Sequence, residues 1–368
     1  MALSDPLLLP AGTEFTPDDL IFYADRDSRT LDEALADADL LVSCPHAGSL
    51  IPAELAEFLA PEFTRRLQFD FTDCSTSPIV RRWAELDPRI VYVENPHPRL
   101  VRDPNRARPA DLHADLVEAF ARVRAAGPYN RVDLTGVDAI RPVTFSFFPL
   151  LVEPDSAAGM RVLANSLAAV ATRGLEVYER TRDDLIGRMV DLAFTRARDT
   201  GRPVEFTTLS FHDTMNTTTT RDGAVNVARA PEDRLPDVVA LSNRGDHNGD
   251  PRGDHPVTMA PGMIRALADA HRTGFAVDGE AVALNQPYLG SQEIISAGRR
   301  FAELAPQAAA AGVTLAAVQA EFRREFLLGP TLTAELHEPG VGWPVADPDQ
   351  VESIAELCRA AWDAYRAR

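Results

Sequence analysis

Two histidines follow β-rich segments in widely separated parts of the chain, and both are suited to bind a metal ion. His46 comes just after a predicted strand through Leu41 and Val42, because Pro45 cannot continue a sheet ladder. His212 follows the run EFTTLSF, which is rich in β-branched and aromatic residues. Ligand sites of open α/β sheets gather at the carboxyl ends of strands. The two imidazoles meet only if their strands are neighbours, and each alone could equally be an ordinary loop residue.

Carboxylates that could complete a hydrolytic metal site are also present. Such a site needs three protein ligands, an open position for water and a carboxylate that accepts the proton of that water. Asp70 or Asp73 could be the acidic ligand, although two aspartates before a helix commonly cap it. Glu321 could be the base, and the apolar spacing of residues 315–328 predicts a helix around it. The chain has no HExxH or HxxE pair at these histidines, so spacing alone is a weak signal for zinc.

An arginine-rich turn follows the predicted strand IVYVE, with Arg99, Arg102, Arg106 and Arg108 within ten positions. Guanidinium groups bind carboxylates through two parallel hydrogen bonds, so the turn predicts a small acidic ligand. Arg106 or Arg99 could hold a substrate carboxylate or an oxyanion. The alternative is ion pairing with the protein's own acidic residues, which we expect for at least two of the four.

Two other groupings could carry chemistry. Cys44 could act as a nucleophile beside His46, but residues i and i+2 share a face only if the strand persists, and a lone cysteine is more often a small buried hydrophobe. The loop over residues 241–258 contains His247, His255 and several aspartates. It lacks the spacing of an EF-hand, so solvated turn chemistry explains it better than a metal site.

Composition excludes several classes of protein. The 368 residues carry a net charge of −18, which makes nucleic acid and anionic membranes poor partners. All 37 basic residues are arginines, so Schiff-base, P-loop and kinase-type lysines are excluded. Three widely spaced cysteines without a CxxC motif fit a reducing compartment, and the first residues do not resemble a signal peptide, so we expect a cytoplasmic protein. The oligomeric state is left open, and a monomer is compatible with the sequence.

The order of predicted elements favours one α/β domain with insertions. Apolar residues at helical spacing predict a long helix over residues 156–200, with breaks near Gly174 and Gly187. We divide the chain into an N-terminal lead-in (1–40), a single catalytic α/β domain (41–330) and a C-terminal helical extension (331–368).

Five short motifs occur in the order seen in N-formylglutamate amidohydrolases, and the chain resembles that family from about residue 40 to about residue 328. The motifs are PHAGSLIP, RLVRDPNR, SFHD, NQPYLGSQEI and VQAEFRRE. The resemblance implies a zinc-carboxypeptidase-like α/β fold, in which helices flank a mixed sheet in a three-layer, phosphorylase/hydrolase-like architecture. It also implies hydrolysis of an N-formyl or N-acyl amide of an acidic amino acid such as N-formylglutamate, so a small carboxylated amide is the expected partner.

The resemblance assigns roles to individual residues. His46 matches the histidine of a Pro-His-Ser-Gly motif, and His212 matches that of an Asp-x-His-Ser motif. The ligands expected for Zn²⁺ or another divalent metal are His46, Asp73 and His212, with Asp70 as the alternative acid. The catalytic residues expected are Glu321, which with Gln319 matches a Gln-x-Glu helix, and Arg106. The substrate-binding residues expected are Arg99, Asn105, Arg106 and Asn285, and Asp103 completes the Arg-x-x-x-Asp-x-Asn-Arg match.

The chain departs from the family pattern around the second histidine. Ser210 stands where the family has aspartate, and Asp213 stands where it has serine. A carboxylate that orients a ligand histidine is therefore missing or moved by one residue. The departures support one alternative to a metal-dependent hydrolase, a non-catalytic protein that binds a carboxylated metabolite on the same fold. A Cys44-dependent amidase is a separate alternative.

Overall fold

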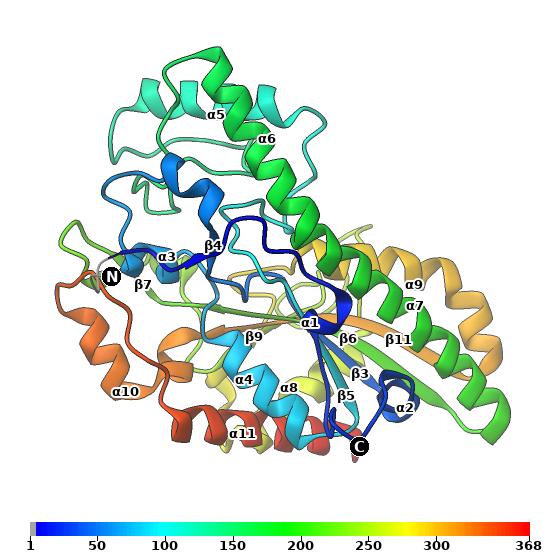
Figure 1. Cartoon of the computed structure of the whole chain (residues 1–368). Helices are drawn as coiled ribbons and strands as arrows, with labels where there is room; N and C mark the ends of the chain where they lie inside the picture. Colours follow the sequence, from blue (N-terminus) through cyan, green and yellow to red (C-terminus); the bar gives the residue numbers. More distant parts are fainter. Residues whose placement is uncertain (1–4) are drawn as a thin grey trace.

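A seven-stranded mixed sheet forms the centre of the molecule, as a computed structural model of residues 5–368 shows (Figure 1). The first four residues of the expected lead-in lie outside the described part of the chain. The strands, in their order across the sheet, are β10 (Val282–Leu284), β9 (Val239–Ser242), β11 (Val313–Arg323), β6 (Val204–Thr214), β3 (Leu40–Cys44), β5 (Ile90–Glu94) and β2 (Ile21–Phe22).

The middle of this sheet is parallel. β6 pairs in parallel with β3 on one side and with β11 on the other. β9 is antiparallel to β11 but parallel to β10, and β2 is antiparallel to β5. In this register Ser210 lies opposite Ser43 on β3, and His212 lies opposite Glu321 on β11. Because parallel strands end at the same edge of a sheet, their carboxyl ends bring together segments that are far apart in the sequence.

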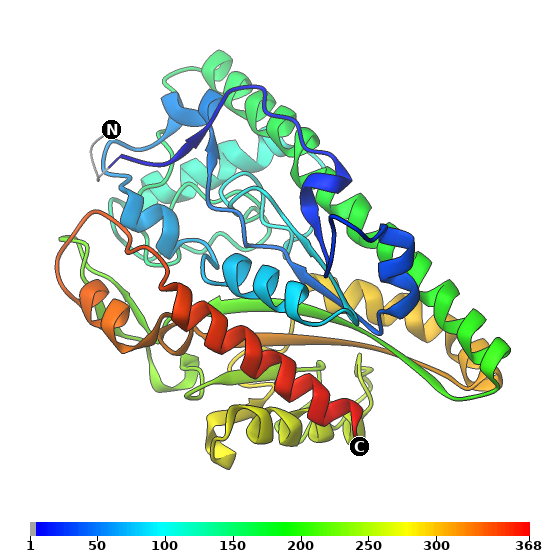
Figure 2. The same cartoon turned by 60° about the horizontal axis from the view of Figure 1, so that its bottom comes forward.

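Helices cover both faces of the sheet (Figures 1 and 2). One apolar core packs strand residues such as Leu41 and Phe206 against α6 (Ala157–Arg173), α7 (Leu175–Thr200) and α9 (Gln292–Ala311). The other core packs residues such as Val42 and Phe211 against α4 (Thr76–Leu86), α8 (Pro261–Phe275) and α11 (Pro348–Arg366). None of the helices within residues 5–368 combines the length and apolar character needed to cross a membrane.

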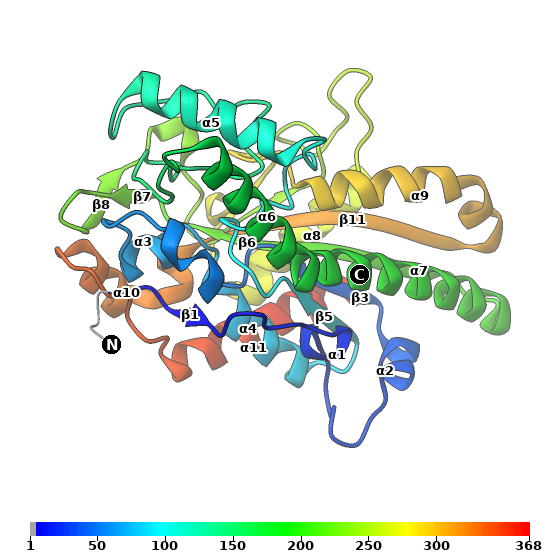
Figure 3. The same ribbon diagram turned by 45° about the horizontal axis from the view of Figure 1, so that its top comes forward.

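A smaller layer of α5, the beginning of α6 and irregular chain lies above the sheet (Figure 3). The helix α5 (Leu112–Ala126) begins at Asp111, whose carboxylate accepts a hydrogen bond from the amide of Ala114. The helix α10 (Arg324–His337) follows β11 directly. The remaining elements are short: β1 (Leu8–Leu9), α1 (Pro17–Leu20), α2 (Leu31–Asp37), β4 (Ile51–Pro52), η1 (Ala53–Phe58), α3 (Arg65–Asp70), β7 (Thr217–Thr219), β8 (Val225–Ala228), η2 (Pro231–Asp233) and η3 (Gly279–Ala281).

The helix predicted over residues 315–328 is wrong, because the chain forms strand β11 up to Arg323 and only then turns into α10. A central strand that is buried on both faces has no polar side, so its apolar residues do not alternate. Alanine, leucine, glutamine and glutamate also have high helix propensity, which tertiary packing overrides here. The long helix breaks at Gly174, as predicted, whereas Gly187 lies inside α7.

Gly48 allows the loop that carries His46 to pass against the loop after β5. A Cβ atom on Gly48 would overlap the backbone carbonyl of Pro96 and the amide nitrogen of His97, and backbone cannot move aside as a flexible side chain can.

We therefore predict that Gly48→Ala lowers the free energy of unfolding by about 1–3 kcal/mol, measured by urea denaturation. Gly262→Ala is the control, because it is an exposed position in α8 with open space around its Cβ. The control should be neutral or slightly stabilising, since alanine is the better helix former. Equal stability of the two variants would show that the close approach at Gly48 is not a constraint.

Candidate metal centre and substrate cavity

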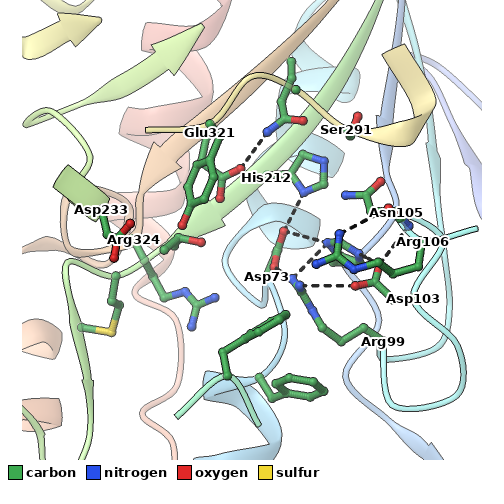
Figure 4. A pocket seen from close by; sticks show the side chains of 18 of the residues that line it. Asp73, Arg99, Asp103, Asn105, Arg106, His212, Asp233, Ser291, Glu321 and Arg324 are labelled. Carbon is green, nitrogen blue, oxygen red and sulfur yellow. Dashed lines mark hydrogen bonds and ion pairs between the residues drawn. The ribbon is translucent and has the colours of Figure 1, made fainter. Parts of the chain in front are cut away.

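A cavity of about 580 Å³ lies at the carboxyl ends of the central strands (Figure 4). Its floor includes His46 after β3, His212 on β6 and Glu321 on β11. Its walls come from the arginine-rich turn, from residues 144–146 in the upper layer, and from residues 288–292, the last of which begins α9. Residues 144–146 belong to a stretch of irregular chain.

His46, Asp73 and His212 converge at this floor and could hold a metal ion. Their three candidate ligand atoms lie within 4.8 Å of one another, and all three residues are buried. An Asp73 carboxylate oxygen lies 2.9 Å from Nδ1 of His212 and 3.4 Å from Nδ1 of His46. Two imidazoles and a carboxylate are a common ligand set for zinc and other divalent ions.

In each histidine ring Nε2 is the outer nitrogen, the one on the side away from Asp73, and it faces a hydrogen-bond acceptor. Nε2 of His46 lies 2.8 Å from the Asp103 carboxylate, and Nε2 of His212 lies 3.0 Å from the Ser210 hydroxyl. When the outer nitrogen carries the proton, Nδ1 keeps its lone pair, and both lone pairs are then directed to Asp73. The donor set therefore fits a bound cation.

Glu293 takes the role of the carboxylate that the family pattern has at position 210, where this chain has serine, near the second histidine, His212. The Ser210 hydroxyl donates to Glu293 at 2.9 Å and so leaves its oxygen free to accept from His212. Glu293 also accepts from Ser43 at 2.7 Å and from the Tyr178 hydroxyl at 2.6 Å. Burial opposes ionisation, but the Arg182 guanidinium and the Tyr178 hydroxyl outweigh it and lower the pKa of Glu293 to about 2. His212 is thus tied through Ser210 to a charged carboxylate.

Asp213 has a different task from the one that the departure suggested. Successive strand residues point to opposite faces, so Asp213 faces away from the ring of His212. Its carboxylate accepts from Nε of Arg324 and, at 2.9 Å, from the amide of Ser75. It therefore attaches the start of α4 and the start of α10 to the sheet, close beneath Asp73.

Arg99 is the cation that balances Asp73 (Figure 4). Burial raises the pKa of the Asp73 carboxyl, but Arg99 and His46 outweigh burial and hold that pKa well below its usual range. Nη2 of Arg99 also lies 3.0 Å from Nδ1 of His46. An ion bound by His46 would therefore compete with Arg99 for Nδ1 of His46, whereas Arg99 hydrogen bonds to Oδ1 of Asp73 and both imidazoles face Oδ2.

Glu321 lies beside His212 because the two residues are partners in the parallel ladder of β6 and β11. Gln319, two residues earlier on the same face, donates from its amide to the Glu321 carboxylate at 2.9 Å. Burial raises the pKa of Glu321, which brings the carboxylate closer to the value that suits a base near neutral pH.

All four arginines of the turn form ion pairs with the protein's own acidic residues. Arg102 pairs with Glu179 and Arg108 with Glu176, both outside the cavity lining. Arg99 and Arg106 line the cavity, and Arg106 also pairs with Asp138 at 2.7 Å.

The amide residues expected to bind substrate lie in different places. Asn105 lines the cavity, and its side-chain oxygen is buried without a hydrogen-bond partner. Asn285 does not line the cavity: its amide donates to Asn243 at 2.9 Å and to the backbone carbonyl of Asp246 at 2.6 Å. Asn285 therefore holds the loop after β9 in place.

The other candidate acidic, nucleophilic and metal-binding residues lie apart from the His46-Asp73-His212 cluster. Asp70 lines the cavity but accepts a hydrogen bond from Thr219 at 2.6 Å and stays outside the ligand cluster. Cys44 packs in the apolar core, outside the cavity lining, and burial raises the pKa of its thiol well above its usual value. His247 and His255 are exposed and belong to no metal-binding group of the described residues.

Helices cover both faces of the mixed sheet, and the buried His-Asp-His cluster, which could hold a metal ion, lies beside a glutamate. The family model described as N-formylglutamate amidohydrolase matches residues 38–328, and the chain therefore belongs to this family. Family membership implies amidohydrolase activity. No curated protein and no solved structure matches the chain.

Sequence reasoning missed Glu293 and two further cavity arginines, Arg229 and Arg244. Glu293 is part of the motif NQPYLGSQEI, so the motif itself was a signal that this glutamate has a function. Arg229 and Arg244 belong to none of the five motifs, and only the folded chain brings them to the cavity.

The hydrogen bonds that connect His212 to Ser210 and Ser210 to Glu293, here called the Ser210 relay, lead to a prediction about metal affinity. We expect Ser210→Ala to weaken Zn²⁺ binding by roughly 10–100-fold, because His212 loses the partner that fixes its ring and its proton. Calorimetric titration of the metal-depleted protein measures this effect.

Ser43→Ala is the matched control, since Ser43 donates to the same Glu293 carboxylate without touching His212. Its metal affinity should stay within about threefold of wild type. The relay would be refuted if both serine variants bound Zn²⁺ equally well.

Proposed function

We propose that this protein is a metal-dependent amidohydrolase that cleaves the amide bond of an N-formyl or N-acyl acidic amino acid, with N-formyl-L-glutamate as the first candidate substrate. The proposal depends on one observation: two imidazole Nδ1 atoms and the Asp73 carboxylate converge beside Glu321 at the floor of a cavity. Zn²⁺ is the proposed ion, and another divalent metal could take its place. His46, Asp73 and His212 would hold it.

A bound divalent ion would supply a lowered pKa for water and polarisation of the substrate carbonyl. Glu321 then accepts a proton from the attacking water as the oxygen of the water bonds to the acyl carbon. Glu321 passes this proton to the amide nitrogen as the carbon–nitrogen bond breaks, so that formate (or another carboxylic acid) and a free amino acid leave. Gln319 fixes the orientation of the Glu321 carboxylate through its 2.9 Å hydrogen bond.

Arg106 and Arg99 are proposed to bind the α-carboxylate of the substrate or the oxyanion of the tetrahedral intermediate. Both guanidinium groups reach the cavity, and the unpartnered side-chain oxygen of Asn105 lies in the same wall. The ion pairs of Arg99 with Asp73 and of Arg106 with Asp138 hold the two side chains in place before substrate arrives.

The detailed fold type, the cellular location and the absence of nucleic-acid and membrane binding are part of the same proposal. We propose a zinc-carboxypeptidase-like architecture, which is supported by the parallel strands at the site and the helices on both faces. We also propose a cytoplasmic protein that binds no nucleic acid and no membrane. The charge of −18 and three unpaired cysteines support this proposal.

The two alternative functions have less support. The non-catalytic alternative depended on a missing carboxylate behind His212, and Glu293 now fills this role through Ser210. The Cys44 amidase needs an accessible thiolate, whereas Cys44 is fully buried and lies outside the cavity lining.

The direct test is formate release from N-formyl-L-glutamate by the purified full chain. We expect activity that is lost on treatment with a chelator and restored by Zn²⁺ or Co²⁺. Turnover that survives complete metal removal would contradict metal dependence, and absence of turnover with any N-formyl or N-acyl acidic amino acid would contradict the hydrolase.

Glu321→Gln tests the base separately from the metal. We expect kcat/KM to fall by about 10²–10⁴-fold, since glutamine cannot accept the proton. The stoichiometry of bound metal should remain that of wild type. Retention of more than about a tenth of wild-type activity would remove Glu321 from the proposed proton path.

A further inference from the structure

Two arginines in the cavity have no acidic partner. Arg99, Arg106 and Arg324 each pair with a carboxylate of the protein. Arg229 and Arg244 also line the cavity, and within residues 5–368 neither forms an ion pair or a side-chain hydrogen bond. Both are half-buried, and Nε of Arg229 is fully buried without a hydrogen-bond partner. In a protein with a charge of −18, unpaired and partly desolvated cations are unexpected unless they serve a ligand.

Both arginines flank one turn of the chain. Arg244 lies two residues after β9, and its amide donates to the carbonyl of Leu289 at 3.1 Å. Arg229 directly follows β8 and lies close enough to Tyr288 for its charge to oppose the rise in the Tyr288 pKa that burial causes. The segment Tyr288–Leu289 thus joins the two arginines on a wall built from the second half of the chain. Arg99 and Arg106 come from the first half.

Arg244 is held in an unusual backbone conformation. Its φ angle is 71°, in the left-handed region that non-glycine residues seldom adopt, and such strain concentrates at functional positions. The loop around it is fixed by Asn243, whose amide donates to the carbonyls of Gly249 and Met259 at 2.9 and 2.8 Å. The direction from which Arg244 enters the cavity is therefore set by buried hydrogen bonds.

We propose that Arg229 and Arg244 bind the side-chain carboxylate of the substrate and so make the enzyme select acidic over neutral N-formyl amino acids. This inference rests on the proposed function and adds the residues that determine specificity. Guanidinium groups suit this task because they donate two parallel hydrogen bonds to a carboxylate and stay charged at every physiological pH. Asp233 and Glu321 line the same cavity, and no ion pair joins either of them to these arginines. The positive charge is thus available to a ligand.

The test compares N-formyl-L-glutamate with N-formyl-L-glutamine, which have the same shape and α-carboxylate and differ in the side-chain charge. We expect wild type to prefer the glutamate compound in kcat/KM. Arg229→Met and Arg244→Met should each lower kcat/KM for N-formyl-L-glutamate by roughly 10–100-fold, the usual effect of losing a hydrogen bond to a charged group. They should leave kcat/KM for N-formyl-L-glutamine within about threefold of wild type.

Arg252→Met is the matched control, because Arg252 lies in the same loop as Arg244 but is exposed and outside the cavity lining. It should keep the wild-type preference. The proposal is overturned if wild type hydrolyses both compounds equally, or if Arg229→Met and Arg244→Met keep the preference for glutamate.

Equilibrium binding of the same two compounds separates this proposal from the proposed function. If wild type hydrolyses neither compound, N-formyl-L-glutamate is not its substrate. The preference for the glutamate compound and its loss in Arg229→Met and Arg244→Met can still be read from dissociation constants. Calorimetry that finds no binding of N-formyl-L-glutamate, or the same affinity for both compounds, overturns the arginine proposal as well.

Discussion

The parallel pairing of β6 with β3 and β11 is the constraint on which the site depends. It places Ser210 beside Ser43 and His212 beside Glu321, so side chains from three distant segments share one face. Side chains alternate along a strand, so a slip of one residue in either ladder would turn His212 or Glu321 into the opposite core. The apolar residues between them, such as Leu209, Phe211 and Ala320, are buried in that core and oppose such a slip.

Buried charge is the second constraint, and four buried carboxylates around the site each face a cationic or imidazole side chain. Asp73 faces Arg99 and two imidazoles, Asp103 faces His46, Glu293 faces Arg182, and Asp213 faces Arg324. Removing one partner of such a pair leaves an uncompensated buried charge, which costs several kcal/mol, typically about 3–5. The same pairs fix the rings and carboxylates in direction. Stability and preorganisation of the site thus have a common origin.

The strand before His46 and the arginine-rich turn were predictable from the sequence because their signals are local. A proline directly follows β3, and four arginines lie within ten positions in the turn after β5. The strand β11 was not predictable by periodicity, since it is covered on both faces and its composition favours a helix. The position of Glu321 beside His212 consequently came from the resemblance and from the fold, not from spacing.

Contacts between distant segments were the other part that the sequence did not reveal. Glu293 and Ser210 are 83 residues apart, and the departure at Ser210 made the orienting carboxylate seem lost. The family motif has a carboxylate at the position of Ser210, so it does not show that the Ser210 hydroxyl connects His212 to the carboxylate of Glu293. Asn285 shows the opposite case, because its motif suggested substrate binding whereas its amide holds the Asn243 loop.

The most direct test of the metal centre is a crystal structure of the protein soaked with Zn²⁺, with anomalous data collected on both sides of the zinc absorption edge. One strong anomalous peak is expected within bonding distance of Nδ1 of His46, Nδ1 of His212 and a carboxylate oxygen of Asp73. A peak at the exposed His247 and His255 loop with none at this cluster would contradict this expectation, as would a peak bound through Asp70 in place of Asp73.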